Sequence, residues 1–379
     1  MAGPVRHAID VKALEAYLGA NVPEIQTPLE VKQFGYGQSN PTYQLTDRTG
    51  RRYVMRKKPP GKLVSRTAHQ VEREHRIIAA LHGRLPVPRP YCLCEDAAVI
   101  GTPFYVMEFL DGRIFADPAL PGLDAADRRA MWADAVRTLA ALHAVQFADL
   151  GLADFGKHGG FFARQLRTWT SICTAQAAVK DVETGVAVGH LPHYEDLVSF
   201  FSDEKLRPRD RVTLVHGDYK IDNLIFHKTE PRVIGVLDWE MSTVGHPLSD
   251  LANLLYPYVT AEQPAGTAAG QGDPKALPSN AGFRPGATPG LPTREEAAEL
   301  YRQAFRDWWP TPASMEPELR WAQAFNVFRG AAVAQGIAAR VAVRQASSEQ
   351  AATYADARGA MADVAWDMVA RAKGARAKI

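Results

Sequence analysis

The chain has 379 residues, of which 46% are hydrophobic, and its formal net charge is only +2 at pH 7. This length supplies material for two or three hydrophobic cores, and the nearly neutral charge argues against a broad nucleic-acid-binding surface. No apolar run reaches the roughly 18 residues that span a bilayer, and an odd count of 3 cysteines without a secretory leader predicts a reduced, cytoplasmic protein that is not membrane-bound.

The first predicted elements form a small antiparallel sheet. Residues 33–45 combine a Gly-x-Gly segment with alternating Tyr43 and Leu45, which indicates a hairpin whose turn exposes backbone N–H groups. Such donors can cover phosphates, although two glycines near a turn often mean only a turn. Residues 53–56 predict the next strand, which ends in the cation of Arg56. The phosphate-covering residues of the turn would be Gly37, Ser39 and Asn40.

A helix and a hinge strand follow. Residues 67–82 place apolar side chains on one face, which predicts an amphipathic helix with a threonine or serine near its start. Residues 103–112 predict a buried strand that runs into a glycine turn, as at a hinge between two lobes; an ordinary core strand has the same pattern. Backbone groups near Glu108 and Leu110 would bind the edge of adenine or guanine. The side chains that would line this pocket are those of Met107 and Phe109.

Beyond the hinge the pattern becomes helical. Residues 260–292 interrupt it with Gly, Pro, Ala, Ser and Gln, which predicts a long mobile loop that could close over a substrate or be an idle insertion. The predicted helices cover residues 127–145, 161–178, 194–201, 293–309, 317–344 and 348–372.

The segment 216–223 (His-Gly-Asp-Tyr-Lys-Ile-Asp-Asn) lies between strand-like residues and predicts a rigid loop suited to phosphoryl transfer. Asp218 can orient a hydroxyl group and accept its proton, and Lys220 places a cation where the transferring group gathers negative charge. Asn223 and Asp238 supply the hard oxygen ligands that Mg²⁺ prefers. The simpler interpretation of the same residues is a turn and a solvated strand end.

The segment 216–223, together with Asp238, resembles the catalytic signature of the aminoglycoside phosphotransferase and choline kinase-like family, small-molecule relatives of protein kinases. The resemblance runs from about Phe34 to the C-terminal helices. Three segments are similar to the phosphotransferase domains fused to some acyl-CoA dehydrogenases: residues 37–43, 56–61 and 237–240. The resemblance implies a bilobal α+β fold of the protein-kinase type, with a small antiparallel-sheet N-lobe at residues 1–108 and a larger, mainly helical C-lobe at residues 109–379.

The resemblance also implies roles for residues that their own patterns leave open. Arg56 would hold the α and β phosphates of ATP or GTP, and Glu74 would pair with Arg56. An aspartate at the place of Asp250 bonds to the backbone of the catalytic loop in kinase-like folds, so Asp250 and His216 would support the loop without touching substrate. Many relatives have an acidic residue where this chain has His246.

These observations predict an ATP- or GTP-dependent and Mg²⁺-dependent kinase that acts on a hydroxyl group of a small molecule. The subgroup resemblance suggests a hydroxyacyl-CoA or a hydroxy acid as the acceptor. Two alternatives stay open: a kinase of aminoglycosides or amino alcohols, and a kinase-shaped nucleotide-binding protein without catalysis. The sequence leaves the oligomeric state open. The candidates for the acceptor wall, each of which could equally be packing or surface, are Glu240, Arg167 and Arg329.

Overall fold

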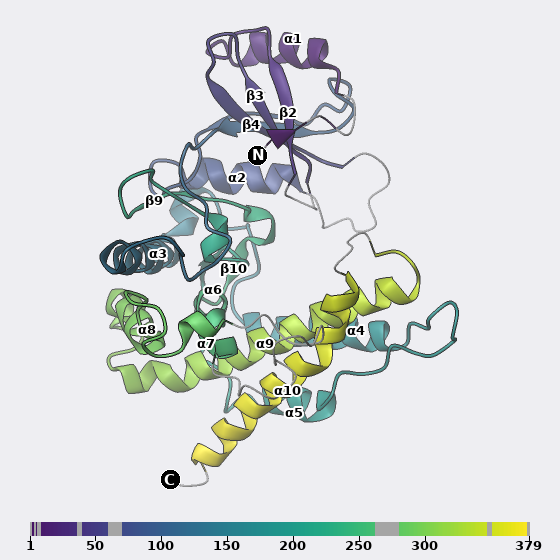
Figure 1. Cartoon of the computed structure of the whole chain (residues 1–379), viewed down its shortest axis with the longest axis vertical. Helices are drawn as coiled ribbons and strands as arrows, with labels where there is room; N and C mark the ends of the chain where they lie inside the picture. Colours follow the sequence, from purple (N-terminus) through teal and green to yellow (C-terminus); the bar gives the residue numbers. More distant parts are fainter. Residues whose placement is uncertain are drawn as a thin grey trace.

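The structure is a computed structural model that describes residues 2–3, 5, 9–35, 40–59, 70–261, 280–346 and 351–376. It has two lobes, with the N-terminal sheet at one end of the molecule and the longest helices at the other (Figure 1). The predicted α+β class with a small antiparallel sheet and a larger helical part is confirmed. The sheet ends at residue 108, and we propose this position as the boundary between the lobes.

The N-lobe is built on a sheet in which every pair of neighbouring strands is antiparallel. Its spatial order is β1-β2-β3-β4-β6-β5, so that β4 and β6 lie in the interior. The strands are β1 (Ala2–Gly3), β2 (Glu30–Phe34), β3 (Thr42–Thr46), β4 (Arg52–Lys57), β5 (Pro90–Cys94) and β6 (Phe104–Glu108).

Both faces of this sheet are covered by helices. Side chains alternate along a strand, so β4 sends Tyr53 and Met55 into one core and Val54 into another. Helix α1 (Val11–Asn21) packs on the first face, and α2 (Val71–Leu81) packs on the second. Helix α2 has Gln70 as its N-cap without a side-chain cap bond, and Thr67, at the predicted start of this helix, lies outside the described residues.

The C-lobe is mainly helical, and its longest helix, α9, packs against α4, α6 and α10. None of the helices in the described ranges is both long and apolar enough to cross a membrane. The helices are α3 (Ala125–Ala144), α4 (Phe161–Ala177), α5 (Tyr194–Ser202), α6 (Leu248–Leu254), α7 (Tyr256–Ala261), α8 (Arg294–Arg302), α9 (Pro312–Ala342) and α10 (Ala351–Arg376). Four short strands lie between α5 and α6: β7 (Thr213–Val215), β8 (Leu224–Phe226), β9 (Val233–Val236) and β10 (Thr243–Gly245).

The predicted mobile loop at 260–292 lies only partly within the described residues. Residues 262–279 lie outside the described residues, but residues 280–292 pack on the C-lobe. The buried Phe283 contacts the rings of Trp132 and Tyr258, with centroid distances of 5.7 and 4.9 Å. Phe283 therefore anchors the start of residues 280–292 on the C-lobe, in a segment whose composition is otherwise polar and small.

Candidate active site

The segment 216–223 forms a tight loop between β7 and β8. Gly217 adopts φ +88°, and a Cβ atom there would lie 2.5 Å from the carbonyl oxygen of Met241. Only glycine fits this position, because any side chain would need both a left-handed backbone and space that the backbone of Met241 occupies. Gly217 thereby turns the chain, and Asp218 follows at the edge of the loop.

Asp250 on α6 fixes the backbone of this loop. Its carboxylate accepts the N–H of His216 at 2.7 Å and the N–H of Gly217 at 2.8 Å. Burial alone would raise the pKa of Asp250, but hydrogen bonding and the charge of His143, together with the contacts of His216, hold this pKa below its ordinary value. The contact predicted for Asp250 is present, and the carboxylate binds the loop without capping its own helix.

His216 links the loop to the strand end that carries Asp238. Its Nδ1 accepts the N–H of Asp218 at 3.2 Å, and its Nε2–H donates to the carbonyl of Leu237 at 2.8 Å. This pair of bonds assigns the neutral Nε2–H tautomer. The rigid imidazole ring of His216 therefore binds the backbone of both Asp218 and Leu237, the residue before Asp238.

The Asp218 carboxylate is held from two sides. Asn223 donates its Nδ2–H to Asp218 Oδ2 at 3.2 Å and also to the Asp218 carbonyl at 2.9 Å. Asn253 on α6 donates to Asp218 Oδ1 at 3.2 Å. The ammonium of Lys220 lies 3.5 Å from Asp218 Oδ2 and 3.2 Å from Asp222, and although burial opposes its charge these carboxylates raise the pKa of Lys220. A cation is thereby kept beside Asp218.

The N-lobe brings a buried ion pair to the same region. Arg56 on β4 lies 2.7 Å from Glu74 on α2, as the resemblance implied. Glu74 also accepts hydrogen bonds from Tyr105 at 3.0 Å and from Asn40 at 2.6 Å. The Asn40 side chain therefore supports the ion pair from the end of the predicted phosphate turn, whose other two candidates, Gly37 and Ser39, lie outside the described residues.

Arg56 also reaches across to the C-lobe. Its guanidinium lies 3.3 Å from Asp238 and 4.0 Å from Glu240, so three carboxylates surround one cation. Burial opposes the charge of Arg56, but Tyr105 and the carboxylates raise its pKa, and it stays a cation. Burial raises the pKa of Glu74 above its ordinary value, and Arg56 opposes that shift. The group therefore has excess negative charge, which a bound metal ion could neutralise.

Asp238 stands next to Asn223 because of the β8–β9 hairpin. Leu224 pairs with Val236, and the N–H of Leu237 donates to the carbonyl of Asn223 at 2.9 Å. Asp238 then turns sharply with φ 66°, a left-handed conformation that aspartate tolerates better than most residues. Asn223 and Asp238, the two predicted metal ligands, therefore lie at adjacent strand ends. Among the described residues there is no group of three or more His, Cys, Asp or Glu side chains placed to hold a metal.

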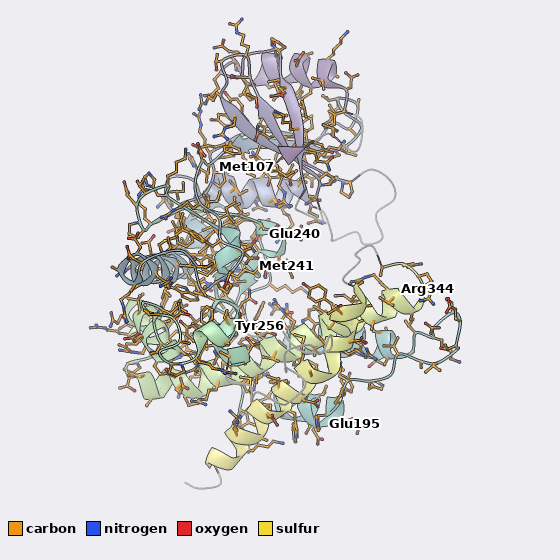
Figure 2. The ribbon with its side chains drawn as sticks, in the orientation of Figure 1. Met107, Glu195, Glu240, Met241, Tyr256 and Arg344 are labelled. Carbon is orange, nitrogen blue, oxygen red and sulfur yellow. The ribbon has the colours of Figure 1, made fainter. Side chains whose placement is uncertain are left out.

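The predicted hinge leads directly into the C-lobe. Met107 on β6 is buried and lies opposite Val54 on β4. Phe109 and Leu110, which follow the end of β6, are half-buried. The N–H of Glu108 donates to the carbonyl of Arg89 at 2.8 Å, so this donor is already used within the N-lobe. Figure 2 places Met107 and Glu240 in the zone where the lobes meet.

The three candidates for the acceptor wall occupy different surroundings. Arg329 on α9 is half-buried and donates to the carbonyl of Gly217 at 3.4 Å. Burial lowers the pKa of Arg329, and the charges of Asp218 and Asp250 oppose that shift. Glu240 belongs to the Arg56 cluster described above. Arg167 is exposed on α4, and no contact of the described residues joins it to the loop 216–223.

Two further polar residues of the site were not predicted. Asn253 contacts Asp218, and the buried His143 on α3 contacts Asp250 Oδ2 at 3.1 Å. Asn253 follows Asp250 by three residues, so both lie on one face of α6, and this spacing is a signal that could have identified it. No local pattern marks His143, because it meets Asp250 only through tertiary packing of α3.

His246 stands where the family resemblance predicts an acidic residue in many relatives. It is buried, its Nδ1 accepts the N–H of Leu248 at 3.2 Å, and its Nε2–H donates to the carbonyl of Arg209 at 3.0 Å. The neutral ring therefore satisfies a free N–H at the start of α6, as a carboxylate cap would. Burial lowers the pKa of His246 from 6.5 to about 3.

This burial predicts acid sensitivity. The unfolded chain binds a proton at His246 as the pH falls through 6.5, whereas the native protein does so only near pH 3, so acidification in this range favours unfolding. The contribution is on the order of a few kcal/mol. Urea unfolding at pH 7.5 and pH 4.5 should show a smaller loss of unfolding free energy for His246→Asn than for the unchanged chain. The control is His158→Asn, an exposed position, and an equal loss in all three proteins would contradict the prediction.

Comparison with known proteins places this site in a family. Acyl-CoA dehydrogenase family member 11 from Rattus norvegicus is 37% identical over 353 residues, which cover 91% of this chain and 41% of that protein. Acyl-CoA dehydrogenase family member 10 from Mus musculus is 38% identical over 378 residues, which cover 97% of this chain and 32% of that protein. The chain thus spans less than half the length of these curated relatives, and the predicted subgroup resemblance is confirmed.

Solved structures agree on the fold. A Ralstonia eutropha JMP134 protein, provisionally named an aminoglycoside phosphotransferase, is 35% identical, with a TM-score of 0.75 and coverage of 96% of this chain and 99% of that chain. A macrolide 2'-phosphotransferase from Brachybacterium faecium has 16% identity and a TM-score of 0.52 over 93% of this chain and 97% of that chain, which shows a shared fold. The profile of the phosphotransferase enzyme family matches residues 30–282. The chain belongs to this phosphotransferase enzyme family.

Proposed function

We propose that the chain transfers the terminal phosphoryl group of ATP or GTP to a hydroxyl group of a small molecule, with Mg²⁺. One observation carries this proposal: Arg56 of the N-lobe lies 3.3 Å from Asp238 of the C-lobe, beside the strand end that also carries Asn223. Groups suited to phosphates and to a metal therefore converge from segments far apart in the sequence. A kinase-shaped protein that only binds nucleotide would need neither a base nor two metal ligands.

The proposed reaction assigns a role to each group. The acceptor oxygen forms a bond to the terminal phosphorus, the bond to the departing nucleoside diphosphate breaks, and the acceptor proton passes to Asp218. Lys220 lies where it can offset the negative charge of the transferring group. Arg56, held by Glu74, would bind the α and β phosphates as a planar, permanent cation. The backbone between Glu108 and Leu110 would bind the base.

The residues present fit a magnesium ion. Asn223 and Asp238 offer one amide and one carboxylate oxygen, and Mg²⁺ commonly combines few protein ligands with phosphate oxygens and water. Three carboxylates around the single guanidinium of Arg56 leave negative charge that a divalent cation would offset. When bound, the ion would neutralise charge on the nucleotide phosphates. Nucleotide binding is also supported by a fold neighbour, an aminoglycoside phosphotransferase solved with ADP and hygromycin B.

The acceptor is proposed to carry an anionic group, as a hydroxyacyl-CoA or a hydroxy acid does. The half-buried Arg329 lies beside the catalytic loop. A cationic aminoglycoside would instead need carboxylates around it.

A screen for nucleoside diphosphate release tests the proposal. The chain is incubated with ATP or GTP, with and without Mg²⁺, and with hydroxyacyl-CoAs, hydroxy acids, amino alcohols or aminoglycosides. We expect turnover with an anionic hydroxyl acceptor and its loss in Asp218→Ala. Turnover with aminoglycosides alone would favour the alternative acceptor class. Tight nucleotide binding without turnover of any acceptor would favour the non-catalytic alternative.

Arg329→Gln is expected to raise the KM of an anionic acceptor by roughly 10- to 100-fold, because a charge-assisted contact is lost, while the KM of the nucleotide changes little. The matched control is Arg167→Gln, which removes the same charge from the exposed face of α4 and should leave both constants unchanged. Initial rates at varied acceptor concentration measure both effects. An equal rise in both variants would remove Arg329 from the acceptor site.

A further inference from the structure

One face of α6 contacts four consecutive residues of the catalytic loop. Asp250 accepts the N–H groups of residues 216 and 217. Asn253, three residues later and on the same face, donates to the Asp218 carboxylate at 3.2 Å and to the Tyr219 carbonyl at 3.2 Å. Asp250 therefore fixes the loop backbone, whereas Asn253 also reaches the side chain that would do the chemistry.

The orientation of the Asn253 amide follows from its partners. A carboxylate oxygen and a carbonyl oxygen only accept hydrogen bonds, so the atom that contacts both of them must be the NH₂ group. The opposite atom of the amide, Oδ1, accepts from Asn326 on α9 at 3.5 Å, which is consistent with this orientation. Asn253 therefore presents two N–H donors, one for each oxygen.

The two oxygens of Asp218 have separate amide donors. Asn223 donates to Oδ2, the oxygen that Lys220 also approaches, and Asn253 donates to Oδ1. Asn223 alone would leave the carboxylate free to rotate about the bond to its Cβ atom. With Asn253 also bound, rotation in either direction breaks a hydrogen bond to a charged acceptor, which is stronger than a neutral one.

We propose that Asn253 is a positioning residue that holds the Asp218 carboxylate in the orientation from which it accepts the proton of the acceptor hydroxyl. This inference rests on the proposed function. The cations around Asp218 are Lys220 of its own loop and Arg329 of α9. The Lys220 ammonium lies 3.5 Å from Oδ2, the oxygen that Asn223 already binds, and Arg329 contacts the carbonyl of Gly217, so neither cation takes the place of Asn253 at Oδ1.

Three variants of similar size separate positioning from packing. Asn253→Leu removes the donors, and Asn253→Asp replaces them with a second carboxylate against Asp218. The matched control, Asn326→Leu, removes only the donor behind Asn253. ADP release with Mg²⁺ is measured over a range of ATP concentrations that reaches saturation, with water and with each hydroxyl acceptor as phosphoryl acceptor. We expect kcat to fall roughly 10- to 100-fold in Asn253→Leu and further in Asn253→Asp, with the KM of ATP within about 2-fold.

A double-substitution cycle with Asp218 supplies the decisive readout. If Asn253 acts through Asp218, Asn253→Leu should lower kcat by less than about 2-fold when Asp218→Asn is already present. An equal loss of kcat with and without Asp218→Asn would overturn the inference, because a merely structural role is independent of Asp218. So would an unchanged kcat in Asn253→Leu, or a loss in Asn326→Leu as large as in Asn253→Leu.

The same double-substitution cycle can be measured by thermal unfolding, which does not require catalytic turnover. We expect the change in Tm of the double variant to differ by more than about 1 °C from the sum of the two single changes. If the unchanged chain shows no turnover with any acceptor, the proposed function fails, and additive Tm changes would then also overturn the link between Asn253 and Asp218. Coupled Tm changes without turnover would retain that link and reject only the reaction.

Discussion

Asp218→Ala is expected to lower kcat by roughly 10²- to 10⁴-fold while ATP still binds, as is usual when a general base is lost. The carboxylate is the group of the loop that Asn223 and Asn253 hold from both sides, and its side chain is 29% exposed, so a hydroxyl group can reach it. The groups proposed to hold the nucleotide, such as Arg56 and Glu74, lie in the other lobe. The loss should therefore fall on the chemical step, measured as ADP release at saturating ATP and acceptor, with ATP affinity measured separately.

Asp222→Ala is the matched control for this prediction. Asp222 belongs to the same loop and also lies near Lys220, at 3.2 Å, but its side chain is more exposed, at 42%. Its removal alters the same local charge without removing the carboxylate that the two amides hold. We expect a change in kcat of only a few fold. Unchanged turnover in Asp218→Ala, or an equal loss in Asp222→Ala, would exclude Asp218 as the base.

Elements with strong periodicity were predictable from the sequence. The strand that ends in Arg56, the hinge strand and the long C-terminal helices follow from alternation or from helical spacing of apolar residues, and the structure has them as β4, β6, α9 and α10. The segment 216–223 was also recognisable, since its polar residues interrupt two buried strands. The placement of Glu74 against Arg56 came from the family resemblance, because nothing in a helical period says which glutamate turns inward.

Features that depend on tertiary packing were not predictable. Asn253 acquires its partner only when α6 meets the loop 216–223, and His143 acquires its partner only when α3 meets α6. Phe283 anchors residues 280–292 because Trp132 and Tyr258 provide an aromatic site for it, which composition cannot reveal. The capping function of His246 is another such case, since an imidazole acts as a cap only where a neighbouring carbonyl fixes its tautomer.

Asp238→Asn is expected to make activity depend on higher Mg²⁺ and to lower the rate at limiting Mg²⁺ by on the order of 10²-fold. The proposed site has only two protein ligands, so the loss of the one carboxylate removes its main charge. Asparagine tolerates the left-handed backbone at this position, where φ is 66°, so the hairpin end should keep its shape. ADP release is measured over a series of Mg²⁺ concentrations at fixed ATP. Chelation of the metal should abolish turnover in both proteins.

Glu240→Gln separates the metal from the general charge of the site. Asp238 and Glu240 both lie within 4.0 Å of the Arg56 guanidinium, so each substitution removes one negative charge beside the same cation. Of these two residues, only Asp238 lies at the end of the β8–β9 hairpin that carries Asn223. If the carboxylates act merely as counter-ions of Arg56, both variants should change the Mg²⁺ dependence equally. If Asp238 is a ligand, its variant alone should shift the curve, and Glu240→Gln should change activity without moving the Mg²⁺ concentration at half-maximal rate.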